Sequence, residues 1–367
     1  MKTKDQIQKE ALGALKRVSK GGIEVSMGVG KTLLGLKHMA VNYTDISKFL
    51  VVAPKIKIFL SWQDDMTKFK YDHLEEHVTF TTYRSLVKQD LDYDVIYLDE
   101  CHSLKDSHAA WLQEYEAKGG IIIGLTGTYP TRKGTEKWKM CTTYCPKLYE
   151  YKTDDAISDK ILNDYKILVH QLTLDDKQTI EKDGKFGQYY TSEVKEYNYW
   201  TNRLDSARPG KDEQICRIQR MKSIQMFPSK EIYAQKLFNK QKDKTIVFAN
   251  TQAQADSLCD YSVHSKNKKS DEYLQMFKDG SITKLSAVEQ LSEGVTIPEL
   301  RVGIIMHAYG NNRKTSQKIG RLLRLNPNDT AEIHILCYSK TVDEKWVESA
   351  LSHLDQNKIK WITPYAI

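Results

Sequence analysis

The chain has 367 residues, a formal net charge of +7, and 40% hydrophobic against 28% charged residues. This length is too great for one ordinary hydrophobic core and suits two domains, and the composition is that of a soluble globular protein. No apolar run reaches the length of a membrane span, and the charged first residues lack the apolar region of a signal peptide. We therefore expect a cytoplasmic protein, whose moderate positive charge permits a polyanionic partner without requiring one.

The first segment in chain order is predicted to be a helix, a short strand and a second helix. Apolar residues recur at helical spacing within the first twenty residues, and a β-branched run follows at 23–26. The second helix opens at Lys31. Its predicted apolar stripe, spaced for packing on a sheet, is Leu33, Leu36, Ala40 and Tyr43.

The turn between the strand and the second helix is predicted to bind a polyphosphate. Gly28 and Gly30 allow a loop whose backbone N–H groups converge, next to the positive end of a helix. Lys31 would reach the β- and γ-phosphates, and the Thr32 hydroxyl would bind Mg²⁺. The full phosphate-loop pattern has glycine at position 25, where this chain has Val25.

Short apolar runs then alternate with helical stretches, which predicts a parallel sheet covered on both faces over residues 1–150. The predicted strands are 49–53, 78–81, 95–98 and 121–125. Ligands bind at the carboxyl ends of such strands, and polar residues follow each of these runs.

Asp99 and Glu100 end the third of these runs. Two carboxylates at the end of a buried strand are costly unless a positive charge lies nearby, and a nucleotide-bound Mg²⁺ would supply that charge. Asp99 would contact Mg²⁺ through its water shell, and Glu100 would orient and deprotonate the attacking water.

Residues 151–240 have a weaker pattern and are interpreted as a connecting and accessory region of mixed strand and helix. Its strand-like segment is 165–173, and its helical segments are 217–227 and 231–238. Aromatic residues gather among lysines between these segments. Such residues either stack on nucleic-acid bases or fill a small core, and the core is the commoner outcome. They are Tyr189, Tyr190, Tyr197, Tyr199 and Trp200.

Residues 241–367 return to the α/β alternation, without a glycine loop of their own. The predicted strands are 245–248, 284–288, 302–306 and 333–338. On a helix, Gln317, Arg321 and Arg324 share one face. Paired arginines suit anionic oxygens, although a solvated basic face is the ordinary alternative.

Eight segments in this order resemble the motifs of the superfamily 2 DExH-box helicases and translocases. The segments are S-M-G-V-G-K-T, V-V-A-P-K, T-T-Y-R-S-L, D-E-C-H, G-L-T-G-T-Y-P, I-V-F-A-N, L-S-E-G-V-T-I-P and Q-K-I-G-R-L-L-R. The resemblance covers roughly residues 6–340 and implies two RecA-like domains. The G-L-T-G-T form is similar to DNA-acting groups, namely UvsW-type phage helicases, RecG enzymes, restriction-enzyme motors and Swi/Snf-type translocases. A phage or bacterial source would suit the short chain.

The resemblance also implies roles for individual residues, with ATP and Mg²⁺ as cofactors. The residues implied in ATP binding are Gln8, which lies in a Q-x-E-A segment, Met27, Gly28, Val29, Gly30, Lys31, Thr32 and Gly294. Gln317, Arg321 and Arg324 would complete the catalytic set, with Arg324 as the arginine finger. His102, Thr126, Gly127 and Thr128 would couple the state of ATP to nucleic acid. The implied nucleic-acid contacts are Pro54, Lys55, Thr82, Tyr83, Asn250, Thr251, His264, Ser265 and Lys266.

The sequence thus predicts an ATP-dependent DNA helicase or translocase. An RNA helicase stays open as an alternative, as does a nucleic-acid-binding protein with a weakened motor. The only hints of a weakened motor are two departures from the family pattern, Val25, and Thr296 where the family commonly has aspartate; the other ATPase residues are intact. The six cysteines form no C-x-x-C pair and no zinc pattern, so free thiols are expected.

Overall fold

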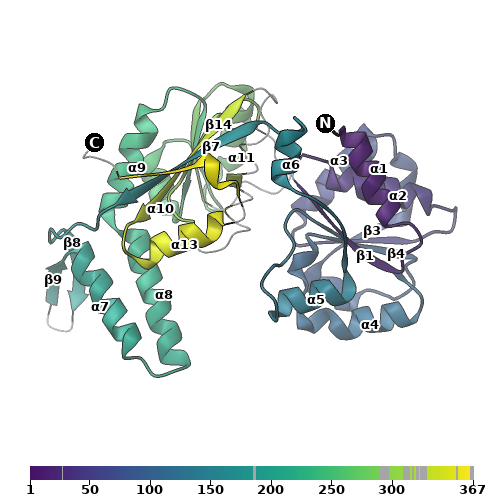
Figure 1. Ribbon diagram of the computed structural model, residues 1–367, viewed down its shortest axis with the longest axis horizontal. Coiled ribbons are helices and arrows are strands. Elements are labelled where there is room, and N and C mark those ends of the chain that lie inside the picture. Colours follow the sequence, from purple (N-terminus) through teal and green to yellow (C-terminus); the bar gives the residue numbers. More distant parts are fainter. Residues whose placement is uncertain are drawn as a thin grey trace. The chain divides into compact units, whose positions relative to one another are not determined.

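The computed structural model describes residues 1–26, 28–184, 187–288, 297–308, 315, 318–319, 322, 329–352 and 354–363. These residues form two compact units that divide between Leu162 and Asn163. Each unit has a parallel sheet flanked by helices, so the predicted α/β class with two RecA-like folds is confirmed (Figure 1). Among the helices described, none has both the length and the apolar character needed to cross a bilayer.

The sheet of the first unit has six parallel strands in the order β3-β2-β4-β5-β1-β6. They are β1 (Lys20–Val25), β2 (Phe49–Ala53), β3 (Val78–Thr82), β4 (Val95–Asp99), β5 (Ile121–Thr126) and β6 (Lys147–Tyr151). No sequence pattern predicts β6, because its mostly exposed K-L-Y-E-Y run lies at the sheet edge and lacks the apolar signal of a central strand.

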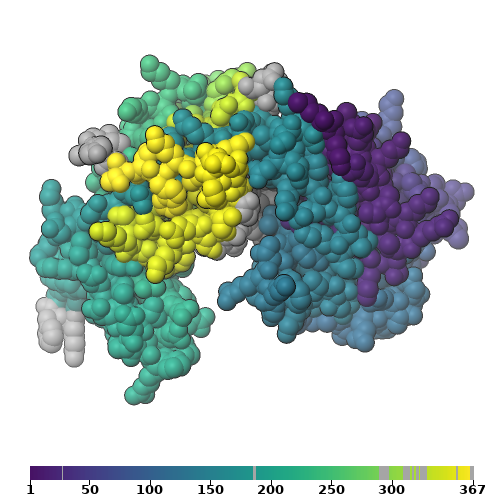
Figure 2. Space-filling view, in the orientation of Figure 1, coloured from purple at the N-terminus to yellow at the C-terminus, as the bar shows by residue number. Residues whose placement is uncertain are grey.

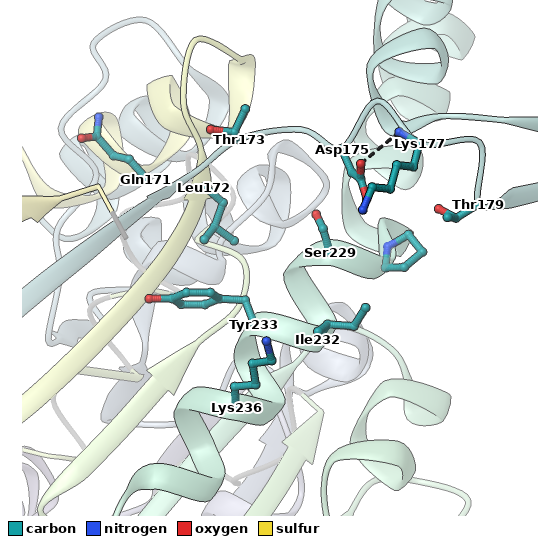
Figure 3. Close-up of a pocket in the computed structure, with 11 residues that line it drawn as sticks. Gln171, Leu172, Thr173, Asp175, Lys177, Thr179, Ser229, Ile232, Tyr233 and Lys236 are labelled. Carbon is teal, nitrogen blue, oxygen red and sulfur yellow. Dashed lines mark hydrogen bonds between the residues drawn. The ribbon is translucent and has the colours of Figure 1, made fainter. Parts of the chain in front are cut away.

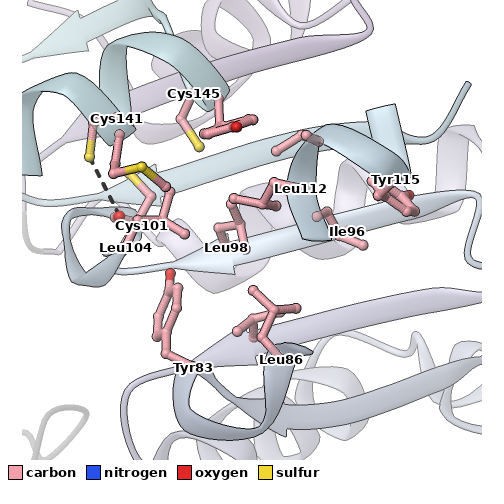
Figure 4. Close-up of a cluster of buried hydrophobic side chains, with 14 of the residues drawn as sticks. Tyr83, Leu86, Ile96, Leu98, Cys101, Leu104, Leu112, Tyr115, Cys141 and Cys145 are labelled. Atoms are coloured by element: carbon pink, nitrogen blue, oxygen red, sulfur yellow. Dashed lines mark hydrogen bonds between the residues drawn. The ribbon is translucent and has the colours of Figure 1, made fainter. Parts of the chain in front are cut away.

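Helices cover both faces of this sheet, and alternate strand residues pack on each face. The helices are α1 (Lys4–Ala14), α2 (Lys31–Val41), α3 (Lys57–Lys68), α4 (Ala109–Ala117), α5 (Glu136–Tyr144) and α6 (Thr153–Ser158). Ile96 and Leu98 pack with Leu112 of α4 and with three cysteines in the core drawn in Figure 4. All six cysteines of the chain are free thiols, as expected.

The apolar stripe predicted for α2 is wrong except at Leu36. The buried residues are Leu34, Gly35, Leu36, His38 and Met39, whereas the other predicted positions are only half-buried. The reason is that α2 packs between α1 and α3 as well as on β5, so its buried face is wider than one stripe.

The second unit has a seven-stranded parallel sheet in the order β11-β12-β10-β13-β14-β7-β15. The strands are β7 (Asp164–Leu172), β10 (Thr245–Ala249), β11 (Ser262–Val263), β12 (Lys284–Val288), β13 (Val302–Ile305), β14 (Thr330–Tyr338) and β15 (Ile359–Ile362). Residues 151–240, interpreted as a connecting region, therefore supply β7 to the interior of this sheet. The predicted domain limits stay a prediction, since compactness alone does not define a domain.

A small lobe extends from the second sheet (Figures 1 and 2). It consists of the antiparallel hairpin β8 (Ile180–Gly184) and β9 (Gly187–Thr191), with the packed helices α7 (Glu193–Asp205) and α8 (Lys211–Met226). The other helices among the described residues of this unit are α9 (Pro228–Lys240), α10 (Gln252–Leu258), α11 (Ser270–Asp279) and α13 (Val342–Leu351). Of the aromatic group, Tyr189, Tyr190 and Tyr199 are exposed. Tyr197 packs against the core of the unit, and Trp200 is half-buried with its indole N–H donating to Glu196.

Candidate nucleotide site

The predicted phosphate loop joins β1 to α2. Gly28 and Gly30 have φ angles of 92° and 94°, in the left-handed region that favours glycine. A Cβ at Gly28 would also lie 2.7 Å from a methyl carbon of Leu162. Val25, by contrast, is the last residue of β1 and is fully buried, without a positive φ. The structure therefore explains Val25 as a strand residue at a position that does not require glycine.

Gln8 of α1 is hydrogen-bonded to the backbone of this loop. Its side-chain Nε2 donates to the carbonyl of Val29 at 2.7 Å, and its Oε1 accepts from Lys37 Nζ at 2.7 Å. The side chain is only 4% exposed. Both ends of the amide are thus occupied by protein, and Gln8 contacts the backbone of the loop directly.

Lys31 and Glu100 form an ion pair, with 2.8 Å between Nζ and Oε1. The two residues follow β1 and β4, which are separated in the sheet by β5 alone. Because parallel strands end at the same edge, the sheet brings together side chains that are 69 residues apart. Glu100 has a φ of 52°, so the chain turns sharply as it leaves β4.

The second carboxylate oxygen of Glu100 lies in a polar cluster with His102 and Thr126. His102 Nδ1 and Thr126 Oγ1 each lie 3.4 Å from Glu100 Oε2, and they are hydrogen-bonded to each other at 2.9 Å. Thr126 Oγ1 also accepts from the backbone N–H of Thr128 at 3.1 Å. Gly127 is the residue between these two threonines. Two of the four residues predicted to couple ATP to nucleic acid therefore contact Glu100, and a third, Thr128, is linked to it through Thr126.

Asp99, the other member of the acidic pair, is buried at the end of β4. Its Oδ2 accepts from the indole N–H of Trp62 at 3.0 Å, and its backbone carbonyl accepts from the hydroxyl of Tyr83 at 2.9 Å. Burial, followed by the negative charge of Glu100, raises the pKa of Asp99 to about 6. The carboxyl is therefore in a site that disfavours its charge unless a cation is near.

Thr32 occupies the first turn of α2, beside Asp65 of α3. Burial raises the pKa of Asp65, and the Thr32 hydroxyl offsets part of this effect. The described part of the chain contains no cluster of three or more acidic, histidine or cysteine side chains that could hold a metal. A site of one carboxylate and one hydroxyl suits Mg²⁺, which keeps several waters and is bound together with substrate phosphates.

The predicted nucleic-acid contacts of the first unit lie at the same sheet edge. Ala53 pairs with Thr82, so Pro54 and Lys55 leave β2 beside the residues that follow β3. Lys55 is exposed, and Pro54 and Thr82 are half-buried. Tyr83 differs, because its ring is 6% exposed and belongs to the core.

The contacts predicted for the second unit are also brought together. Asn250 and Thr251 follow β10, and Thr251 caps α10. His264 is buried beside Asp256, while Ser265 and Lys266 are exposed just after β11. Gln252 Nε2 donates to Ser265 Oγ at 3.1 Å and links the two segments.

Several predicted residues lie outside the described residues. They are Met27, Gly294, Thr296, Gln317, Arg321 and Arg324. Two residues that the motifs did not indicate, Trp62 and Asp65, contact the predicted magnesium ligands. Their only signal in the sequence is a spacing of three residues on an amphipathic helix, which does not distinguish them from packing residues.

A cavity of about 650 Å³ lies in the second unit between the end of β7 and α9 (Figure 3). Thr173 and Lys177 line it from the segment after β7, and Ser229, Tyr233 and Lys236 line it from α9. It contains none of the residues that the sequence predicts for catalysis. The contacts that link Lys31, Glu100 and Thr126 instead lie at the strand ends of the first unit.

A glycine loop, a lysine and an acidic pair at neighbouring ends of a parallel sheet define a P-loop ATPase. Comparison with known families agrees with this class. Residues 2–131 match the family "Type III restriction enzyme, res subunit", and residues 229–326 match "Helicase conserved C-terminal domain". The chain belongs to the superfamily 2 helicases and translocases, and it is an enzyme of the ATPase/helicase class.

Individual relatives are distant. The chain is 22% identical over 359 residues to the DNA 3'-5' translocase XPB2 of Sulfurisphaera tokodaii, covering 90% of this chain and 80% of that protein. The Hef helicase domain of Pyrococcus furiosus has a similar fold, with a TM-score of 0.55 and 15% identity over 94% of this chain and 97% of that one. The Type ISP restriction-modification enzyme LlaBIII, solved bound to DNA, has a TM-score of 0.65 and 14% identity, and the match covers 99% of this chain but 31% of that enzyme.

Proposed function

We propose that this chain is an ATP-driven motor that moves on, unwinds or remodels DNA, and that it hydrolyses ATP at the strand ends of the first unit. The observation that carries the proposal is the convergence of Lys31, Glu100 and Thr126 from β1, β4 and β5. Three adjacent parallel strands bring an ammonium group and a hydroxyl into contact with one carboxylate, which supports their assignment as phosphate-binding cation, polar relay and base.

The donor set fits Mg²⁺ and a nucleoside triphosphate. The loop from Gly28 to Gly30 leads directly into α2, whose first turn carries Lys31 and Thr32. Asp99 supplies a carboxylate, and we assign it together with the Thr32 hydroxyl to Mg²⁺, with Asp99 acting through water. Bound Mg²⁺ would neutralise the charge that develops on the transferred phosphoryl group.

The remaining steps belong to the side chains. The ammonium group of Lys31 contacts Glu100 in the structure. The same group is expected to bind the β- and γ-phosphates, so phosphate binding would draw it away from Glu100. Glu100 would then be free to accept the proton of the attacking water. His102 and Thr126 contact the same carboxylate, so they would respond when Glu100 loses its contact with Lys31. Thr126 would pass this change to Gly127 and Thr128 through its hydrogen bond with Thr128.

The other catalytic assignments depend on the sequence motifs alone. We assign phosphate contact to Arg321, the arginine finger to Arg324, and supporting roles in nucleotide binding and catalysis to Gly294 and Gln317.

DNA is the proposed track because the relatives include a DNA translocase and a restriction enzyme solved with DNA. Contacts to phosphate and sugar would make binding strongly salt-dependent, with little sequence preference. The exposed candidates for these contacts are Lys55, Ser265 and Lys266. Pro54, Thr82, Asn250 and Thr251 are half-buried candidates beside them, and the buried Tyr83 and His264 would act by supporting them.

The test is ATP hydrolysis with no nucleic acid, single-stranded DNA, duplex or forked DNA, and RNA. We expect low activity alone and a strong rise with DNA; a response confined to RNA would reject the DNA track. Lys31→Ala and Glu100→Gln should abolish turnover, while Glu100→Gln still binds ATP. Lys20→Ala and Glu116→Gln are the matched controls, because Lys20 and Glu116 form a surface ion pair of 2.5 Å in the same unit. Full activity of Glu100→Gln, or no hydrolysis by the wild type with any nucleic acid, would overturn the proposal.

A further inference from the structure

Helix α3 presents two polar groups to the nucleotide site from one face. The indole N–H of Trp62 donates to Asp99 Oδ2 at 3.0 Å, and the carboxylate of Asp65 lies beside the hydroxyl of Thr32. The two residues are separated by three positions, so they lie together on the helix surface. Neither belongs to a segment that resembles a helicase motif.

The ring of Trp62 packs in the core, whereas its N–H makes a hydrogen bond to the nucleotide site. The ring is fully buried, tilted against Tyr97 with 6.2 Å between centroids, and it lies so close to Gly35 that no Cβ fits there. A phenyl ring would meet much of this packing requirement. Only the indole N–H, which can donate but not accept, makes the bond to Asp99.

Both neighbours can prepare a ligand to bind a cation. A carboxylate with Oδ2 held by a donor has a fixed orientation, which also directs Oδ1. The Asp65 carboxylate beside Thr32 is an acceptor for the hydroxyl proton, and a hydroxyl that donates in this direction keeps its oxygen lone pairs for a metal. Partners of this kind orient metal ligands in many proteins.

We infer that α3 is a positioning element for Mg²⁺, in which Trp62 orients the Asp99 carboxylate and Asp65 orients the Thr32 hydroxyl. The inference rests on the proposed function, since it takes Asp99 and Thr32 as the residues that hold the ion. It assigns no contact with the ion to Trp62 or Asp65 themselves.

The test compares Trp62→Phe with Trp111→Phe. Trp111 is also nearly buried in the first unit, and its indole N–H also makes one hydrogen bond, to the carbonyl of Gln89 at 2.9 Å, away from the acidic pair. The measurement is the binding of a fluorescent ADP analogue at increasing Mg²⁺, and in EDTA. Trp62→Phe should raise the Mg²⁺ concentration for half-maximal binding by about tenfold and leave binding in EDTA unchanged. Trp111→Phe should change neither.

A second pair keeps the inference testable if Trp62→Phe does not fold. Asp65→Ala should also raise the Mg²⁺ concentration for half-maximal binding. Asp64→Ala, at the exposed neighbouring position, should behave as the wild type. Equal Mg²⁺ dependence within both pairs would overturn the inference. A wild-type protein that shows no Mg²⁺-dependent nucleotide binding would instead reject the proposed function, so the two failures are distinguishable.

Discussion

Replacement of Gly35 by alanine tests whether the packing of α2 against α3 supports the nucleotide site. Gly35 lies in α2, and an ideal Cβ there would lie 2.4 Å from Trp62 Cη2 and 3.0 Å from Cζ3. Carbon atoms in contact are normally about 3.5 to 4.0 Å apart. The ring must therefore move by roughly 1 Å, and it is fully buried.

Two effects of opposite sign decide the result. Alanine in place of glycine within a helix stabilises by about 0.5 to 1 kcal/mol. Forcing an extra methyl group into a packed core destabilises by about 1 to 3 kcal/mol. Leu125 Cδ1 also lies 3.3 Å from the added Cβ, so the methyl group meets a second close neighbour. We expect Gly35→Ala to destabilise the first unit by about 0.5 to 2 kcal/mol, on the same scales.

The assay is urea unfolding, with Gly13→Ala as the matched control. Gly13 lies in α1 with no atom within 4 Å of an added Cβ, so alanine there should stabilise by up to about 1 kcal/mol. The double variant Gly35→Ala/Trp62→Phe should recover part of the loss, because phenylalanine lacks the ring atoms that clash. If Gly35→Ala stabilises as Gly13→Ala does, the close packing of Trp62 on α2 is wrong.

Three further variants test other contacts. Gln8→Ala should weaken ATP and GTP binding by the same factor in equilibrium titrations, because the amide holds the loop backbone; a loss confined to ATP would show a contact with the base instead. Burial lowers the pKa of His38 to about 4, below its value of about 6.5 in the unfolded chain. Between pH 6.5 and 4 the unfolded chain therefore binds one more proton than the folded chain. Up to about 3 kcal/mol of the free energy of unfolding, present above pH 6.5, is lost as the pH falls through this range. His38→Gln should flatten this slope in unfolding measurements, and exposed His73→Gln should leave it unchanged. Lys230→Met should destabilise the second unit by about 3 to 5 kcal/mol by leaving Asp343 buried without its cation, and the double variant Lys230→Met/Asp343→Leu should recover most of that loss in thermal unfolding.

Much of the fold was predictable because central parallel strands are apolar on both faces. The runs 49–53 and 284–288 coincide with β2 and β12, and most other predicted strands differ by one residue at an end. The edge strand β6 and the hairpin strand β9 were missed, since both are mostly exposed and carry no apolar run. The stripe of α2 was wrong because three neighbouring elements, not one, bury that helix.

Local sequence is enough to predict which chemical groups are present and which strands they follow. Gly28, Gly30, Lys31, Asp99 and Glu100 are predicted from local spacing, because a loop between strand and helix is a local structure. The partners of these residues, by contrast, depend on tertiary packing. The contact of Gln8 with the loop, of Trp62 with Asp99 and of Asp65 with Thr32 depend on how α1 and α3 pack beside α2. These contacts join residues that no periodic pattern relates, since packing depends on side-chain shape across elements far apart in the chain.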